Sequence, residues 1–342
     1  MNAPLRLRLD SQALTDNWRT LNAMSGAAAC GAAVKADGYG LGARGVAERL
    51  ASAGCRDFFV ATWAEAEALA PLGLNLSVLH GLRVEDIAAA RAGFARPVLG
   101  TVQQIARWRE AGGGACDVMV DTGMSRLGVA AQDVAAGLLD GLAIETLMSH
   151  LACADEDVAK NARQRDAFAA LAGKTSAKRM SLANSAGIAL GDGYAFDLTR
   201  PGLALYGGRQ RAGHQAIRQV VTPEAQILQR RTVRAGETVG YNATWTAPAD
   251  TEVAILNIGY ADGYFRGFSN RGAARVDGVT LPVIGRVSMD LTAVKVDAVP
   301  GLAEGDWLAI NYDLPAAAAA SGMSQYELIT SLGSRFDRAW SD

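Results

Sequence analysis

The sequence is poor in the residues that build metal centres and disulfide frameworks. Its 342 residues include three histidines and four cysteines. The cysteines are scattered and form no C-x-x-C pair: Cys30, Cys55, Cys116 and Cys153. Cysteines spaced in this way are typical of reduced core thiols in a cytosolic protein rather than of a zinc site or a set of bridges. We therefore expect neither a metal site nor disulfides.

An excess of charge of one sign and long apolar runs are also lacking. Lys and Arg number 33 against 35 Asp and Glu, which leaves a formal net charge of −2 and argues against a nucleic acid or an anionic membrane as partner. No apolar run reaches the ~18 residues of a membrane span. The N-terminal stretch "MNAPLRLRLDSQ" has no apolar core of a secretory signal, so we expect a cytoplasmic location.

Short apolar runs and amphipathic, alanine-rich stretches alternate over residues 1–220. Strand-like runs such as "FFVAT" and "CDVMVD" alternate with helix-like stretches such as "GVAERLASAG" and "VQQIARWREAG". Most of the helical stretches end in Gly, which is a stop signal for helices. About eight strand–helix units in roughly 210 residues favour a (β/α)8 barrel over a doubly wound sheet.

The pattern changes to one typical of β structure at about residue 221. Val, Thr, Ile and Tyr become frequent, and Asp277-Gly278 is a candidate hairpin turn. We expect residues 221–312 to be mainly β, followed by helices at "AAAAA" and "SQYELITSL". The predicted fold is an α/β barrel over residues 1–220, followed by a β-rich domain over residues 221–342.

Lys35 ends the apolar run "CGAAVKA" and so falls at the carboxyl end of a predicted strand, where barrels carry their reactive groups. Apolar neighbours would lower the pKa of its amine and make it available as a base or as a nucleophile toward a carbonyl group. From the strand alone, a lysine that reaches out to solvent is the competing interpretation.

A set of motifs along the chain favours the first interpretation. After "KADGYGLG" come, in order, "VDTGMSRLG", "SHLACADE", "LANSAG", "RPGLALYG", "IGYADGYFR" and "GRVSMD". The set resembles the alanine racemase family of pyridoxal 5'-phosphate (PLP) enzymes, which consist of an eight-stranded barrel and a C-terminal β domain. The resemblance covers nearly the whole chain. It implies interconversion of L- and D-alanine, which supplies D-alanine for peptidoglycan, by a homodimer with shared active sites.

The resemblance implies a role for each cofactor-binding residue. Lys35 would hold PLP covalently, and its phosphate would be bound by Tyr39, Ser185, Gly202, Leu203 and Tyr326. Arg200 would face the ring nitrogen. Because a guanidinium can only donate, it leaves that nitrogen unprotonated and the ring a weaker electron sink, which disfavours decarboxylation. Taken singly, Tyr39 could equally be a surface tyrosine, Ser185 a helix cap and Arg200 a salt-bridge partner.

Racemisation needs proton removal on one face of the α-carbon and proton return on the other, so two groups are expected. By the resemblance, Lys35 serves the D-enantiomer and Tyr260, supplied by the partner subunit, serves the L-enantiomer. A free tyrosine holds its proton at neutral pH. His150 and Arg200 would assist the Tyr260 hydroxyl, although His150 alone could be a core histidine.

Two further residues would bind the substrate. Arg126 matches an arginine that reaches the substrate carboxylate, and Met289 matches a position that offers its backbone N–H to the same group. Many family members have a lysine, which can be carbamylated, where this chain has Met119. A thioether cannot be carbamylated and cannot anchor Arg126 by charge, so the departure concerns substrate affinity more than reaction type.

The sequence leaves other functions open. A racemase of broader specificity, for example one that also takes serine, would use the same residues. Arg200 and Tyr260 weigh against a decarboxylase or an aldolase. A non-catalytic PLP carrier would match the barrel alone, so the β-rich region with "GYADGY" argues against it.

Overall fold

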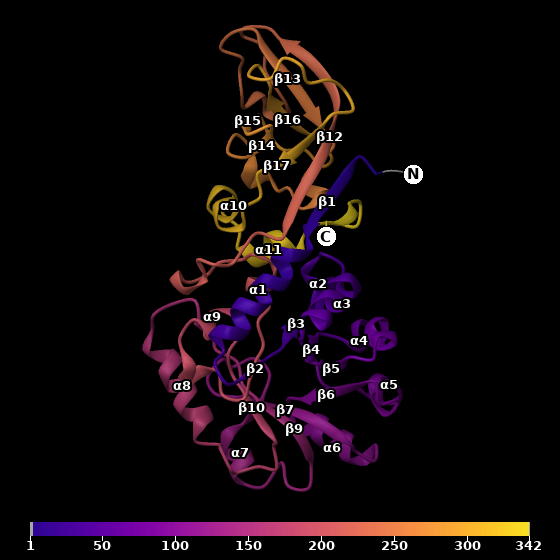
Figure 1. Ribbon diagram of the computed structural model, residues 1–342, viewed down its shortest axis with the longest axis vertical. Helices are drawn as coiled ribbons and strands as arrows, with labels where there is room; N and C mark the ends of the chain where they lie inside the picture. Colours follow the sequence, from indigo (N-terminus) through magenta and orange to yellow (C-terminus); the bar gives the residue numbers. More distant parts are fainter. Residues whose placement is uncertain (1–2, 342) are drawn as a thin grey trace. The chain divides into compact units, whose positions relative to one another are not determined.

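The computed structural model describes residues 3–341 (Figure 1). Contacts divide the chain into two compact units. The barrel unit is Leu14–Arg218, and the β unit joins Met1–Ala13 to Gln219–Asp342. Within the described residues, each unit has a large sheet of its own.

Seven parallel strands within residues 3–341 form the sheet of the barrel unit, in the spatial order β3-β4-β5-β6-β7-β9-β10. A short strand, β8 (Val129–Ala130), pairs with β7 beside this path. The seven strands are β3 (Ala32–Ala33), β4 (Asp57–Val60), β5 (Asn75–Val78), β6 (Ala95–Leu99), β7 (Ala115–Asp121), β9 (Ala143–Met148) and β10 (Arg179–Ser181).

An eighth position closes this sheet into a barrel. β11 (Leu198–Thr199) pairs in parallel with β2 (Ala29–Cys30), which directly precedes β3. On its other side, the chain leaving β11 bonds to the chain leaving β10, because the backbone nitrogen of Arg200 donates to the carbonyl of Ala183 at 2.8 Å. The predicted (β/α)8 barrel is therefore confirmed.

Helices alternate with the strands along the barrel unit (Figure 1). All four residues of β4 are buried, as expected for a parallel strand covered on both faces. α3 ends at Gly54, whose φ of 116° lies in the left-handed region that a stop glycine supplies. The helices are α1 (Ser11–Met24), α2 (Lys35–Tyr39), α3 (Ala43–Ala53), α4 (Trp63–Leu69), α5 (Ile87–Arg91), α6 (Val102–Glu110), α7 (Ala131–Ala135), α8 (Ala159–Ala169) and α9 (Ser185–Ile188).

Charged side chains pair near the amino-terminal ends of the barrel strands. Asp57 accepts two hydrogen bonds from the Arg179 guanidinium, at 2.8 and 3.0 Å. Asp117 is fully buried, accepts a 2.6 Å bond from the Ser77 hydroxyl and lies 3.5 Å from Arg96 Nε. Buried carboxylates are tolerated where cations and donors surround them. These side chains stabilise one end of the barrel, and the carboxyl ends of the strands carry the candidate site.

The β unit contains an eight-stranded sheet within residues 3–341, in the order β13-β16-β15-β14-β17-β12-β1-β18. The longest strand, β12, pairs with β1, β13 and β17. The prediction that residues 221–312 are mainly β is confirmed. The strands are β1 (Leu5–Asp10), β12 (Val221–Val233), β13 (Thr251–Leu256), β14 (Ala273–Val276), β15 (Val279–Ile284), β16 (Thr292–Lys295), β17 (Trp307–Ile310) and β18 (Asp337–Ser341).

The first strand lies in the β unit rather than in the barrel unit. β1 pairs antiparallel with β12 and parallel with β18. The single boundary at residue 220 that the sequence pattern predicts would group this segment with the barrel, and the structure corrects this. The reason for its actual place is visible in "LRLRLD", where Leu5, Leu7 and Leu9 are buried and the residues between them are not. Alternation with period two is typical of a strand with one buried face, not of a barrel strand.

Smaller elements of the β unit follow the sequence pattern. Asp277 and Gly278 connect β14 to β15, and both have positive φ, at 47° and 81°, as this type of hairpin turn requires. The alanine run forms the helix α10 (Leu314–Ser321), and "SQYELITSL" forms α11 (Gln325–Thr330). The predicted turn and helices are therefore confirmed.

Candidate active site

The backbone after Lys35 turns in the left-handed sense. Lys35 follows β3 by one residue, and the φ values of Ala36, Asp37 and Tyr39 are 53°, 52° and 55°. For residues with a β-carbon this conformation costs roughly 1–2 kcal/mol each. Such strain persists where neighbouring contacts hold it, and it is concentrated at functional sites.

Glu65, on α4, holds the start of this turn. One of its carboxylate oxygens accepts a 2.8 Å bond from the backbone nitrogen of Ala36, and the other accepts a 2.6 Å bond from that of Ala61. Glu65 also completes a capping box with Thr62 at the start of α4. The turn that carries Lys35 is thus tied to the adjacent strand–helix junction.

The Lys35 amine is half-buried, and within residues 3–341 it makes no hydrogen bond or ion pair. Burial lowers its pKa below the ordinary lysine value, and the charges of Arg126 and Arg200 lower it further, while Glu65 acts in the opposite direction. A lowered pKa increases the fraction of free amine at neutral pH, which is the form that attacks carbonyl groups.

His150 follows β9 and Arg126 follows β7. The charge of Arg126 is among those that act on the His150 imidazole. Burial, then the charges of Arg200, Arg126 and Lys35, lower the pKa of the half-buried His150 to about 3. The imidazole is therefore neutral at pH 7 and can accept as well as donate. Arg126 is exposed, and no hydrogen bond or ion pair of its side chain is present within the described residues.

Arg200, directly after β11, is buried and held by fixed acceptors. Its guanidinium donates to the carbonyl oxygen of Ser149 at 2.6 Å and to the Ser181 hydroxyl. That hydroxyl in turn donates to the carbonyl of Leu198 at 2.5 Å. Burial lowers the pKa of Arg200 to about 10, so the group is still charged at pH 7 and remains a donor only.

A cluster of donors surrounds Ser185, at the start of α9. The Ser185 hydroxyl accepts from the backbone nitrogens of Gly202 and Ala204, at 2.9 and 3.1 Å. A β-carbon at Gly202 would lie 2.2 Å from the Tyr39 hydroxyl oxygen, so a larger residue there would have to displace the Tyr39 side chain. Leu203 is buried between the two amides. The arrangement of hydroxyls and amides suits the oxygens of a phosphate.

Tyr39 is fixed by packing. Its ring is buried and stacks on that of Tyr206, with 4.7 Å between the ring centroids. The Tyr206 hydroxyl donates at 2.8 Å to the carbonyl of Ala33, at the end of β3. The strand that leads to Lys35 and the ring that borders the Ser185 cluster are thus joined.

In the β unit, Tyr260 and Met289 lie on adjoining segments. The backbone nitrogen of Tyr260 donates to the carbonyl of Ser288, and that of Ala261 to the carbonyl of Met289, both at 3.0 Å. The Met289 side chain is 53% exposed. The guanidinium of Arg266 lies 5.1 Å from the centre of the Tyr260 ring.

The helix α11, which carries Tyr326, adjoins the turn after Tyr260. A β-carbon on Gly263 would lie 2.5 Å from the carbonyl oxygen of Ser331, at the end of α11. The Tyr312 hydroxyl, which donates at 2.9 Å to the carbonyl of Leu328, is buried between these segments. The predicted residues therefore form two groups, one in each unit.

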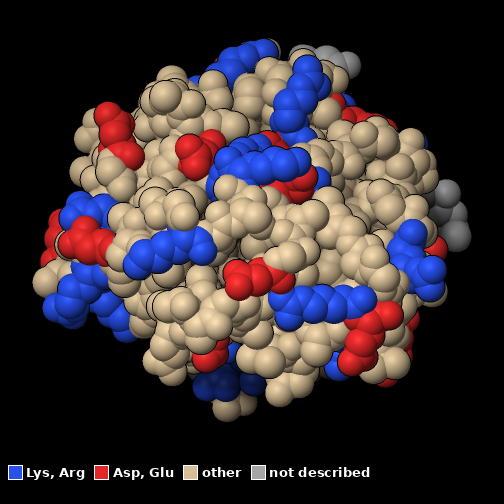
Figure 2. All heavy atoms as spheres, turned by 90° about the horizontal axis from the view of Figure 1, so that it is seen from below, with Lys and Arg blue, Asp and Glu red and all other residues tan. Residues whose placement is uncertain are grey.

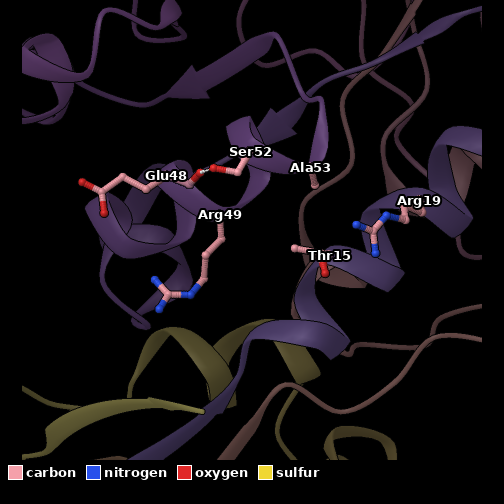
Figure 3. A pocket seen from close by; sticks show the side chains of 6 residues that line it. All are labelled: Thr15, Arg19, Glu48, Arg49, Ser52 and Ala53. Carbon is pink, nitrogen blue, oxygen red and sulfur yellow. Dashed lines mark hydrogen bonds between the residues drawn. The ribbon is translucent and has the colours of Figure 1, made fainter. Parts of the chain in front are cut away.

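A hollow of about 290 Å³ lies between α1 and α3, away from these residues (Figure 3). Its cations already have partners, because Arg19 pairs with Asp16 at 2.9 Å and Arg49 donates to the carbonyl of Gly45 at 3.1 Å. None of the predicted site residues lines it. It is not a second candidate for the active site.

Other kinds of site are not evident in the described part of the chain. Residues 3–341 contain no group of three or more His, Cys, Asp or Glu side chains placed to hold a metal ion. Their helices are too short or too polar to cross a membrane. On the face in Figure 2, basic and acidic side chains are interspersed, and neither sign gathers into a large patch.

Comparison with known proteins covers both units of the chain. Family models described as "Alanine racemase, N-terminal domain" and "Alanine racemase, C-terminal domain" match residues 9–210 and 220–340. The chain belongs to the alanine racemase family. It is therefore an isomerase of the amino-acid racemase class, as the sequence motifs predicted.

Individual relatives span the whole chain. An alanine racemase from Acidiphilium cryptum is 44% identical and covers 99% of both chains. A relative from Agrobacterium fabrum named "Alanine racemase, catabolic" is 42% identical and covers 98% of this chain and 91% of its own length. The crystal structure of alanine racemase from Bartonella henselae with covalently bound pyridoxal phosphate is 32% identical, with a TM-score of 0.89 over 98% of this chain and 99% of that chain.

The sequence did not single out three residues that contact the predicted site residues or the turns that carry them. Glu65 had a visible signal, because Thr62 and Glu65 have the spacing of a capping box. Tyr206, in "RPGLALYG", gave no signal of its contact with Tyr39. Arg335 also gave none, since its partner Asp262 is 73 positions away.

Proposed function

We propose that this chain interconverts L- and D-alanine, using PLP held on Lys35. The observation that carries the proposal is the half-buried Lys35 amine, with its lowered pKa, in the barrel unit that also holds the Ser185 cluster. The chemistry that PLP would supply when bound is an electron sink, which makes the α-proton of the amino acid labile. Alanine is the substrate named for the relatives.

The residues of the barrel unit fit this group. The phosphate would take its hydrogen bonds from Tyr39, Ser185 and the amides of Gly202 and Leu203. The family resemblance adds Tyr326, which belongs to the β unit, as a further donor. Gly202 supports this assignment, because its missing side chain leaves room beside the Tyr39 hydroxyl. Arg200 would face the ring nitrogen as a donor, which favours racemisation over reactions that need a protonated ring.

Two side chains would move the proton. Lys35 would take the α-proton of D-alanine and Tyr260 that of L-alanine, each returning a proton on its own face. The neutral imidazole of His150 and the charged Arg200 would tune the Tyr260 hydroxyl through hydrogen bonds. Tyr260 would come from a second copy of the chain, in a homodimer with shared active sites.

Arg126 and the backbone N–H of Met289 would bind the substrate carboxylate. The exposed guanidinium of Arg126 supports this role, because charge-assisted pairing with a carboxylate is its expected use. Met119, at the place of the family's modifiable lysine, is 9% exposed and supplies no charge. A small pocket would favour alanine. Because an apolar pocket does not strongly reject an analogue that only adds a hydroxyl, activity on serine is the alternative to measure.

We further propose a cytoplasmic enzyme that supplies D-alanine for peptidoglycan. The relative named catabolic makes breakdown of alanine the competing role. Disruption of the gene separates the two, because a biosynthetic role makes growth depend on added D-alanine. Growth without D-alanine, together with loss of growth on alanine as carbon source, would favour the catabolic role.

The activity itself is tested with purified protein and PLP. Borohydride reduction and peptide mapping should place the label on Lys35, and chiral chromatography should show inversion of L-alanine. Label on another lysine would remove the proposed chemistry. A panel of L-amino acids that includes serine gives the specificity.

A further inference from the structure

Arg335 joins two segments of the β unit that hold proposed active-site residues. Its guanidinium donates twice to Asp262, from Nε to Oδ1 at 2.6 Å and from Nη2 to Oδ2 at 2.8 Å. The remaining nitrogen, Nη1, donates to Asp290 at 2.7 Å. One side chain therefore occupies three acceptors on two separate loops.

The two aspartates lie within two positions of the proposed active-site residues. Asp262 lies two positions after Tyr260, in the same 3-10 turn, and Asp290 is next to Met289. Asp262 is fully buried, and its carboxylate also accepts a 3.0 Å bond from the backbone nitrogen of Gly259. The turn is thus braced on both sides of Tyr260.

We propose that Arg335 is a positioning residue, which fixes the Tyr260 turn against the Met289 segment and so sets the place of the Tyr260 hydroxyl. The inference rests on the proposed role of Tyr260 as one of two bases. Arg335 itself need not touch substrate. Its 47% exposed side chain acts through the buried Asp262 and the half-exposed Asp290.

The chemistry of the contact explains why arginine is required. A planar guanidinium matches a carboxylate with two parallel bonds and has a further N–H for a second acceptor, whereas an ammonium is a point charge. Lysine at position 335 keeps the charge but loses the fork. Without any cation, Asp262 would be a buried carboxylate with one amide donor, which is strongly destabilising.

Arg335→Lys is therefore the main variant, and Asp290→Asn weakens only the outer arm of the contact, because it removes the charge of the acceptor but keeps its oxygen. Arg231→Lys, at an exposed arginine of β12, is the matched control. The first measurement uses the protein without cofactor. Hydrogen–deuterium exchange of the amides of Tyr260 and Ala261, which bond to the neighbouring segment, should quicken in Arg335→Lys, less so in Asp290→Asn, and not in the control.

The second measurement separates positioning from general stability. The PLP-loaded enzyme is given D-alanine in deuterium oxide. The rate at which D-alanine gains deuterium without changing configuration (exchange) is compared with the rate at which L-alanine forms (inversion). Lys35 removes and returns a proton on one face, so a misplaced Tyr260 slows inversion more than exchange. The ratio of exchange to inversion should rise about threefold or more in Arg335→Lys. From L-alanine, where Tyr260 acts first, exchange and inversion should fall together.

Either of the two measurements on Arg335→Lys can overturn the inference. Faster amide exchange with an unchanged ratio would leave Arg335 a purely structural residue and overturn the inference. Unchanged amide exchange would overturn it as well. Tyr260→Phe separates this failure from failure of the proposed function: racemisation at the wild-type rate in that variant would remove Tyr260 as a base, and the inference about Arg335 with it.

Discussion

One carboxylate oxygen of Glu65 lies 2.8 Å from the backbone nitrogen of Ala36, the residue next to Lys35. The other oxygen accepts from the backbone nitrogen of Ala61 at 2.6 Å. A single side chain thus bridges the strained turn after β3 and the start of α4. The strain of the left-handed residues is offset locally, next to the half-buried Lys35 amine.

Glu65→Ala should lower the free energy of unfolding by about 2 kcal/mol, because a helix cap and a charge-assisted bond are lost together. It should also weaken PLP binding, since the turn that orients Lys35 is freed. Urea unfolding of the cofactor-free protein and a PLP titration measure the two effects. Glu67→Ala, at an exposed position of the same helix, is the control, and equal behaviour of the two variants would contradict the bridging role.

Gly202→Ala should weaken PLP binding, because the new β-carbon would lie 2.2 Å from the Tyr39 hydroxyl oxygen. Overpacking of this kind costs about 1–3 kcal/mol. In a Tyr39→Phe background, which lacks the nearest atom, Gly202→Ala should cost less PLP affinity than in the wild type, although the ring carbon at 2.8 Å still limits the space. Gly301→Ala, where no atom lies within 4 Å, should have no effect. Strictly additive losses in a double-mutant cycle of PLP affinity would argue against the steric explanation.

Lys35 should be the fastest-labelled lysine of the cofactor-free protein near neutral pH, because burial, Arg126 and Arg200 all lower its pKa. Arg126→Gln removes a nearby positive charge, so the pKa should rise and labelling should slow. Arg163→Gln, at an exposed arginine of α8, should leave the rate unchanged. Mass spectrometry after a short pulse of an amine reagent follows each lysine separately. Faster labelling in Arg126→Gln would reverse the sign of the argument.

The barrel could be predicted because its signals are local. Apolar runs, amphipathic stretches and stop glycines such as Gly54 each depend on a few neighbouring residues, and their alternation implies parallel strands. The resemblance of ordered motifs then supplied Lys35 and Arg200. Both follow barrel strands, as a barrel enzyme requires.

The remaining features depend on contacts that no local pattern encodes. The bond from Ala36 to Glu65 spans 29 positions, and that from Arg335 to Asp262 spans 73. The alternating leucines of "LRLRLD" mark β1 as a strand, but its pairing partners β12 and β18 lie far along the chain. The left-handed turn at Ala36 and Asp37 goes against local preference, which is the kind of conflict expected where function requires it.

The stability of the cofactor-free protein should depend on pH through His150. Its pKa falls from the ordinary 6.5 to about 3 in the folded chain, so between these values the unfolded chain binds a proton that the folded chain does not. The free energy of unfolding should therefore fall as the pH is lowered through this window. Asp117, whose pKa is raised by burial, acts in the opposite sense, and His214, whose pKa is lowered, acts in the same sense.

The contribution of His150 to the pH dependence of stability is isolated by comparing His150→Gln with the wild type, because Asp117 and His214 are present in both. Urea unfolding at several values between about pH 4 and pH 7 should give a flatter curve for this variant than for the wild type. His80→Gln, at an exposed histidine, should follow the wild-type curve. If His150→Gln keeps the full wild-type slope, the imidazole is protonated in the folded chain as readily as in the unfolded one. It would then be a cation at the low end of this range and a poor acceptor for the Tyr260 hydroxyl there.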